Sequence, residues 1–111
     1  MAGIDTALGN SKVPPAWSPE VQETYRVVDW ETDVHTWTLA TDIPPAQQGP
    51  TLALRIGGEA RTLVRQVNPQ MLSQGVNIRD GQGIFMFFTG VQVVVRIITR
   101  RLGPDDEDRN I

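Results

Sequence analysis

Few side chains in this chain of 111 residues have the types and spacing that chemistry requires. His35 is the single histidine, and one imidazole near Asp33 lacks the converging donors of a metal site. Serine-nucleophile motifs are absent, and Gly81-Gln82-Gly83 lacks the lysine and the strand-to-helix frame of a phosphate-binding loop. The absence of cysteine excludes thiol nucleophiles, zinc knuckles and disulfides. We therefore expect no enzymatic activity, cofactor, metal or small-molecule substrate.

Arginine is the remaining candidate for binding chemistry. The guanidinium groups that could hold phosphate oxygens belong to Arg55, Arg61, Arg65, Arg96, Arg100 and Arg101. Nucleic-acid binders usually have a basic pI and aromatic residues among the basic ones, whereas this chain has a pI of about 5.0 and its tryptophans lie among acids. Solvated helix faces are the favoured interpretation. Weak RNA binding through Arg61, Arg65, Arg96, Arg100 and Arg101 is the alternative.

The most hydrophobic stretch is Ile84-Phe85-Met86-Phe87-Phe88, and one helix face cannot bury five such residues in a row. Burial within the core is the default interpretation, and a contact surface for another chain is the alternative. A domain this small has little structure with which to cover both sides of the stretch. We therefore assign Ile84, Phe85, Met86, Phe87 and Phe88 to the intersubunit surface of a homo-oligomer.

Short helices must position these residues. Val27, Trp30, Val34 and Trp37 follow one another at spacings of three, four and three, which predicts one face of a helix that starts near Ser18-Pro19. Pro44-Pro45 ends this helix, because a residue that precedes proline leaves helical geometry.

Glycine and proline divide the middle of the chain. Pro45 is expected to open a second helix that Gly49-Pro50 interrupts. Gly57-Gly58 supplies a left-handed stop before a third helix over residues 59–67. Asn68 then caps a short turn that ends at Gly75.

The last part of the domain has sequence features of both helices and strands. Residues 76–83 indicate a loop or a weak hairpin. Val91–Leu102 has helical spacing together with β-branched residues that suit a strand. Thr89 as an N-cap and the stop at Gly103-Pro104 favour a helix.

These elements predict a mostly α fold, a small bundle of four to five short helices with disordered termini. Residues 1–15 are expected to be a disordered segment, residues 16–104 a single helical domain, and residues 105–111 an acidic disordered tail. The expected core consists of Trp30, Val34 and Trp37 with Leu52, Leu54, Leu63 and Val64. A small core of this kind benefits from oligomerisation.

Charge is distributed unevenly along the chain, although the net charge is only −3. From Glu20 to Asp42 six acids outweigh one arginine, and from Arg55 to Arg101 seven arginines outweigh two acids. Such polarity can orient like subunits or pair opposite faces of one molecule. The apolar run from Ile84 to Ile98 is too short and too interrupted to span a membrane, and no leader pattern begins the chain. We expect a cytoplasmic protein that binds no membrane.

The order of features resembles the Gag capsid region of LTR retrotransposons over roughly Pro15 to Pro104. The segments that carry the resemblance are Thr24-Tyr25, Asp29-Trp30-Glu31, Val34, Trp37, Thr41-Asp42-Ile43-Pro44-Pro45, Gln48-Gly49-Pro50, Leu52-Ala53-Leu54-Arg55-Ile56-Gly57-Gly58-Glu59-Ala60-Arg61, Thr89-Gly90-Val91 and Arg100-Arg101-Leu102-Gly103-Pro104. This resemblance implies an all-helical, capsid-like domain that self-associates and encloses RNA, here as a partial copy.

The expected function is therefore a non-enzymatic self-association module that resembles the front part of a Gag capsid and mediates assembly with itself. The alternatives are a nucleic-acid-binding adaptor that uses the Arg-rich face, and a truncated orphan fragment without retained function. Salt separates the first two, because phosphate binding weakens steeply with salt and apolar association does not.

Overall fold

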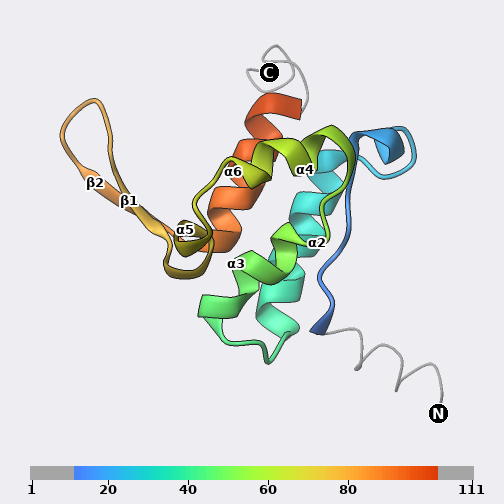
Figure 1. Ribbon diagram of the computed structural model, residues 1–111, viewed down its shortest axis with the longest axis horizontal. Coiled ribbons are helices and arrows are strands. Elements are labelled where there is room, and N and C mark those ends of the chain that lie inside the picture. The colour runs from blue at the N-terminus through green and yellow to red at the C-terminus, as the bar shows by residue number, and fades with distance from the viewer. Residues whose placement is uncertain (1–11, 103–111) are drawn as a thin grey trace.

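The computed structural model describes residues 12–102 and confirms a mostly helical fold with one small hairpin (Figure 1). The elements are the 3₁₀ turn η2 (Pro19–Val21), helices α2 (Val27–Ala40), α3 (Pro45–Ala53), α4 (Gly58–Arg65), α5 (Pro69–Gln74) and α6 (Gly90–Leu102), and strands β1 (Val76–Arg79) and β2 (Phe85–Phe88). Segments 1–11 and 103–111, which include the predicted tail 105–111, lie outside the described residues.

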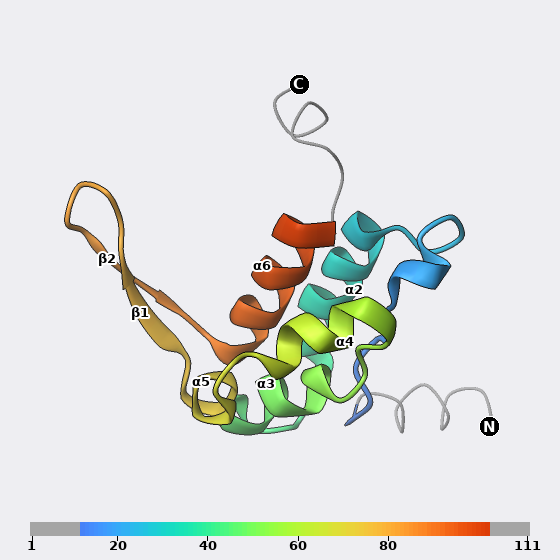
Figure 2. The same cartoon turned by 45° about the horizontal axis from the view of Figure 1, so that its top comes forward.

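Helix α6 lies at the centre of the packing. It contacts α2, α3, α4 and α5, and α3 also packs against α5 (Figure 2). Its buried face consists of Gly90, Val91, Val94 and Ile98, at the helical spacing predicted from the sequence. The choice of helix over strand for Val91–Leu102 is therefore confirmed.

Reciprocal capping fixes the start of α6. The Thr89 hydroxyl accepts a hydrogen bond from the Gln92 amide at 3.2 Å, and the Gln92 side-chain oxygen accepts one from the Thr89 amide at 2.9 Å. This capping box satisfies two backbone donors that a helix start would otherwise leave open. The expected N-cap at Thr89 is confirmed, and so is Asn68 at α5, whose side chain accepts from the Gln70 amide.

Helix α2 buries Val27, Trp30, Val34 and Trp37, as the spacing predicts. Its start, however, lies later than predicted, because the helix begins at Val27 and Pro19 opens only the short turn η2. The reason is that the Tyr25 carbonyl accepts from the Trp17 indole at 2.8 Å, while the Gln22 side chain accepts from the Val27 amide at 3.2 Å. These contacts hold the chain between η2 and α2 in a turn.

Residues 12–15 of the predicted disordered segment 1–15 pack against the domain, while residues 1–11 of that segment lie outside the described residues. Pro14 is fully buried, and the Pro15 carbonyl accepts a hydrogen bond from the Trp30 indole at 3.0 Å. The ring centroids of Trp17 and Trp30 lie 6.0 Å apart, so the segment that carries Trp17 belongs to the core. Trp17 was absent from the predicted core because no helical period marks it.

A short parallel bridge anchors this segment to the turn that follows α3. The Trp17 amide donates to the Arg55 carbonyl at 3.3 Å, and the Gly57 amide donates to the Trp17 carbonyl at 2.9 Å. Residues far apart in sequence are thereby held side by side.

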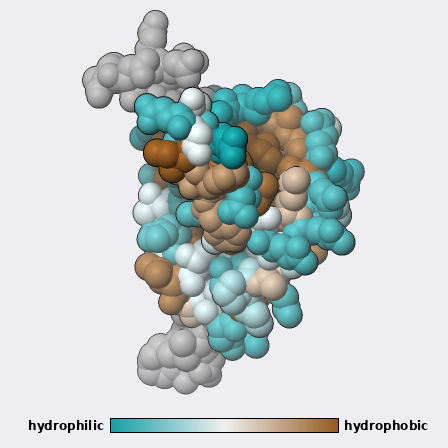
Figure 3. Space-filling view, turned by 90° about the vertical axis from the view of Figure 1, so that its left-hand side faces the viewer, coloured by the Kyte–Doolittle hydropathy of each residue, from teal (hydrophilic) through white to brown (hydrophobic). Residues whose placement is uncertain are grey.

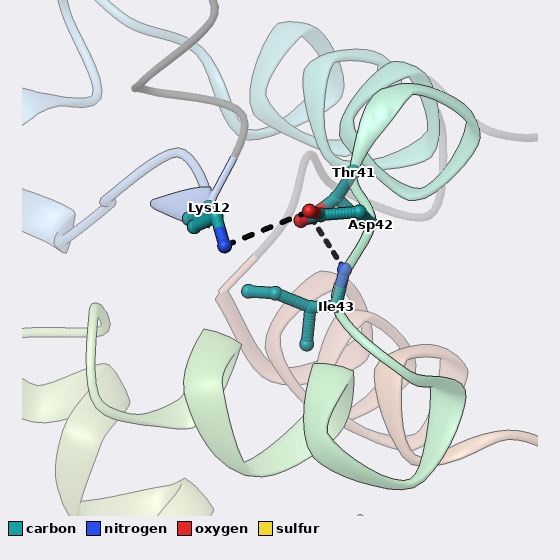
Figure 4. Close-up of polar contacts among 4 residues, drawn as sticks. All are labelled: Lys12, Thr41, Asp42 and Ile43. Carbon is teal, nitrogen blue, oxygen red and sulfur yellow. Dashed lines mark hydrogen bonds and ion pairs between the residues drawn. The ribbon is translucent and has the colours of Figure 1, made fainter.

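A surface ion pair lies close to the connection between α2 and α3 (Figure 4). The Lys12 ammonium is 3.6 Å from the Asp42 carboxylate, and the Thr41 hydroxyl accepts from the Ile43 amide at 3.2 Å. Both charged side chains are about two-thirds exposed, so we expect the pair to contribute little to stability.

The interruption predicted at Gly49-Pro50 is wrong, because α3 continues through both residues. Gly49 instead permits close packing. A Cβ at Gly49 would overlap the Leu72 carbonyl oxygen and lie 2.9 Å from the Gly90 backbone, and a Cβ at Gly90 would overlap the same Leu72 carbonyl. Helices α3, α5 and α6 therefore meet at a backbone contact that only glycine allows.

Two members of the predicted core lie elsewhere. Leu54 is 69% exposed, because α3 ends at Ala53 and the following turn directs Ile56, not Leu54, into the core. Leu63 is half-buried, and α4 buries Ala60 and Val64 instead. Trp30, Val34, Trp37, Leu52 and Val64 are buried as expected.

We predict that Gly49→Ala and Gly90→Ala each destabilise the fold by at least about 2 kcal/mol, because the added methyl group overlaps backbone that cannot move aside. This loss outweighs the gain in helix propensity of about 1 kcal/mol. Chemical denaturation measures the effect, and Gly81→Ala is the control, since nothing lies within 4 Å of a Cβ there. If the Gly49→Ala and Gly90→Ala variants had the same denaturation midpoint as the wild type, the close contact would be contradicted.

The hinge between α3 and α4 gives a second prediction. Gly58 has a φ of 60°, which confirms the expected left-handed position, whereas Gly57 is extended. We expect Gly58→Ala to lower the free energy of unfolding by about 1 to 2 kcal/mol through backbone strain. Gly57→Ala should be near neutral, since its Cβ would meet only the Ser18 Cβ at 3.5 Å. Equal stabilities of the two variants would refute this assignment.

Candidate functional site: a protruding apolar hairpin

Strands β1 and β2 form an antiparallel hairpin that projects from the helical body, with its loop at the far end (Figures 1 and 2). The paired residues are Val76 with Phe88, Asn77 with Phe87, Ile78 with Met86 and Arg79 with Phe85. The weak hairpin considered for residues 76–83 is thus part of a longer one that includes Ile84–Phe88. The default burial of that apolar stretch in the core is wrong.

The hairpin loop is well specified by sequence. The Asp80 amide donates to the Ile84 carbonyl at 2.9 Å, and the Gly83 amide donates to the Asp80 carbonyl at 3.0 Å. The Asp80 carboxylate accepts from the amides of Gln82 and Ile84 at 2.8 and 2.9 Å. Gly83 has a φ of 86°, as the last residue of a type I turn with a G1 bulge requires. Gly81-Gln82-Gly83 therefore serves as a turn.

Side chains alternate between two faces of the hairpin. The groove face, which we name for the hollow beneath it, consists of Val76, Ile78, Met86 and Phe88. The outer face consists of Asn77, Arg79, Phe85 and Phe87. Since directly paired residues share a face, β2 contributes only apolar side chains to both faces, whereas β1 contributes apolar residues to one and polar residues to the other.

The apolar side chains from Ile84 to Phe87 are largely exposed to solvent. Phe85 is 62% exposed, Ile84 58%, Phe87 57% and Met86 49%, while Phe88 at the base is half-buried. Apolar residues gather on the side of the molecule from which the hairpin projects (Figure 3). Adjacent exposed residues of this size form a patch typical of a protein interaction site.

A hollow of about 620 Å³ lies beneath the groove face. Its apolar lining comes from the hairpin, from α5, from α6 and from the segment after α4, through Val67, Met71, Val76, Ile78, Phe88, Val93 and Ile97. Arg96 and Arg100 also line it, and the Arg96 guanidinium lies 5.0 Å from the centre of the Phe88 ring. The hairpin base is therefore held against α6, while the distal part of the hairpin is free.

The five arginines of the predicted nucleic-acid site lie on two helices, Arg61 and Arg65 on α4 and Arg96, Arg100 and Arg101 on α6. Arg61 donates to the carbonyls of Leu54 and Ile56 at 3.3 and 3.4 Å, so it braces the α3–α4 turn. Arg100 and Arg101 line a hollow beside Leu63 and Val67, Arg96 lies over Phe88, and Arg65 is exposed on α4.

Arg79 was missed by the sequence analysis. Its guanidinium lies 4.6 Å from the centre of the Phe85 ring on the outer face. The alternation of Val76, Asn77, Ile78 and Arg79 was the signal that could have placed it on a strand.

A groove of about 700 Å³ between α2 and α6 contains Glu31 and His35, but no group of three or more His, Cys, Asp or Glu residues in positions 12–102 could hold a metal ion. Burial and the hydrogen bond to Asp33 raise the pKa of Tyr25, and a hydrogen bond from Ser18 lowers the pKa of Glu20. Within the same residues, no helix combines the length and apolarity that crossing a membrane needs.

We predict that Asp80→Ala loosens the hairpin locally by about 1 kcal/mol, because two backbone donors lose their acceptor. Amide exchange of Met86 and Phe88 should then rise about fivefold, with the global melting temperature nearly unchanged. Asp80→Asn, which keeps an acceptor oxygen, is the control. If the amides of Met86 and Phe88 exchange as slowly in Asp80→Ala as in Asp80→Asn, the Asp80 side chain does not stabilise the loop.

Comparison of the chain with protein families, curated proteins and solved structures found no match. The resemblance to Gag capsids consequently rests on the residues alone.

Proposed function

We propose that this chain is a non-enzymatic self-association module and that its hairpin supplies the intersubunit surface through Ile84, Phe85, Met86, Phe87 and Phe88. The observation that carries the proposal is the exposure of Ile84 to Phe87, each between 49% and 62%, on an element whose side chains contribute nothing to the buried core. Apolar surface of this kind is stabilised when another surface covers it.

The free energies of apolar burial and of association favour a surface to which both copies contribute. Covering the exposed half of a large apolar side chain stabilises by roughly 1 kcal/mol. Four such side chains from one copy would only match the loss of translational and rotational freedom, which is about 4 kcal/mol or more. Apposition of two hairpins doubles the apolar contribution and leaves a net stabilisation.

The resemblance to the front part of a Gag capsid supports the same proposal. A mostly helical domain that associates with itself is what that resemblance implies, and the helical class agrees with it.

One observation favours the second candidate, a nucleic-acid-binding adaptor. Arg79 lies over Phe85, so the hairpin presents a guanidinium group beside an exposed aromatic ring, and Arg96 of α6 lies over the half-buried Phe88. Proteins that bind single strands combine these two groups, the rings for stacking on bases and the charges for phosphates. Such binding would weaken as salt increases, whereas apolar association would not.

We predict that Phe85→Asp combined with Phe87→Asp converts an oligomer into a monomer, because association would then desolvate two carboxylates. Light scattering measures the mass, and circular dichroism should show unchanged helicity. The control is Leu54→Asp, which places a charge on a side chain that is 69% exposed but lies outside the hairpin, and which should leave the mass unchanged.

Two outcomes would overturn the proposal. Loss of helicity in the double variant at every protein concentration would give the phenylalanines a core role. A wild-type chain that stays monomeric at high micromolar concentration would rule out self-association. In that case, RNA binding that weakens with salt and is lost in the double variant would favour the adaptor, and its absence the fragment without retained function.

A further inference from the structure

We infer that two copies of the chain pair through the free edges of their β2 strands, antiparallel and about a twofold axis at Met86, to form a four-stranded sheet in the order β1-β2-β2-β1. The inference rests on the proposed self-association and specifies its geometry. It follows from the composition of the two strands, from the direction of their backbone groups and from the position of their charges.

The composition of β2 is that of a strand inside a sheet, although β2 lies at an edge. Strand β1 alternates apolar and polar residues, which is typical of a strand with one solvated face. Strand β2 reads Phe-Met-Phe-Phe and is apolar on both faces, which is typical of a strand in the interior of a sheet. In the described chain, however, β2 has a neighbour on one side only.

The edge of β2 also lacks the features with which proteins protect an exposed strand. Charged side chains and proline commonly prevent edge-to-edge pairing, and β2 has neither. Strand β1 carries Arg79 and is followed by Asp80. The unprotected edge is therefore that of β2.

The hairpin loop determines which backbone groups face this free edge. The Asp80 amide donates to the Ile84 carbonyl, so these two residues occupy a hydrogen-bonded position of the ladder. Because such positions alternate in antiparallel pairs, Ile78 with Met86 and Val76 with Phe88 are the next ones. The amide and carbonyl groups of Phe85 and Phe87 consequently point away from β1, toward the open side.

Only one twofold register uses all of these groups. When Phe85 of one copy pairs with Phe87 of the other, and the reverse, both pairs are hydrogen-bonded and the two Met86 residues face each other at the axis. A shift toward the base would require the Thr89 amide, which already donates to Gln92. A shift toward the loop would require the Gly83 amide, which already donates to Asp80.

The side chains agree with this register. On the groove face, Ile78 and Met86 of one copy continue into Met86 and Ile78 of the second copy as one apolar row. On the outer face, the phenylalanines of the two copies are adjacent, and Arg79 lies at the outer end of each row. No charged residue faces a like charge across the axis, so electrostatics does not oppose the pairing.

A cysteine cross-link tests the register, since the chain has no cysteine of its own. The two Met86 Cα atoms would lie about 4.5 Å apart in a non-hydrogen-bonded pair, within the range that a disulfide spans. The two Ile84 Cα atoms would lie roughly 13 Å apart, which a disulfide cannot span. Under mild oxidation we expect Met86→Cys to form a covalent dimer roughly tenfold faster, or more, than Ile84→Cys.

Ile84→Cys is a matched control because Ile84 is more exposed than Met86, so random collisions would favour it. Circular dichroism establishes that both variants retain the wild-type fold. If Ile84→Cys links as fast as or faster than Met86→Cys while light scattering still gives a dimer, the register is wrong and self-association stands. If the wild-type mass remains that of a monomer at high micromolar concentration, the proposed function itself fails.

Discussion

The contact of Gly90 with the Leu72 carbonyl is the constraint on which this architecture depends. It brings the start of α6 against α5, and Gly49 of α3 lies against the same carbonyl. The chain between α5 and α6 must therefore leave the helical body and return to nearly the same point. Gly75 and Phe88 are in contact at the base of this excursion, so the two strands pair from the outset. A projecting hairpin is the consequence.

Because the excursion leaves the body, the residues of the buried core differ from those of the proposed intersubunit surface. The buried core comes from the segment around Trp17 and from α2 to α6, and no side chain of the hairpin belongs to it. Phe88 holds the base of the hairpin against α6, but the exposed apolar side chains from Ile84 to Phe87 contribute nothing to the buried core. A surface that folding does not require, and that is nevertheless strongly apolar, is best explained by contact with another molecule. In the proposed pairing, that molecule is a second copy.

Much of the helical fold could be predicted from local signals. The spacing of Trp30, Val34 and Trp37 placed the buried face of α2, and Thr89 placed the start of α6. The errors arise where tertiary contacts decide. Gly49 resembles a break in sequence, but its packing partners lie in α5 and α6. Trp17 has no helical period, and its burial depends on a bridge to the turn after α3.

The candidate site could be predicted only in part, because its position also depends on tertiary contacts. The apolar run Ile84 to Phe88 is visible in the sequence. Its exposure, however, follows from the contact between the Leu72 carbonyl of α5 and Gly90 of α6, which no local pattern reveals. The pairing of Arg79 with Phe85 depends on the hairpin register, which Asp80 and Gly83 establish. The sequence shows Arg61 only as one arginine among several, because the turn between α3 and α4 is what brings the Leu54 and Ile56 carbonyls to its guanidinium group.

Residue-resolved amide exchange at low and high protein concentration tests the central claim most directly. The amides of Phe85 and Phe87 point away from β1, so within one copy no neighbouring strand protects them. The account predicts that exchange at these two amides slows as concentration rises, while exchange in α2 and in the base of the hairpin stays constant. Exchange at Phe85 and Phe87 that is independent of concentration would contradict association through the hairpin.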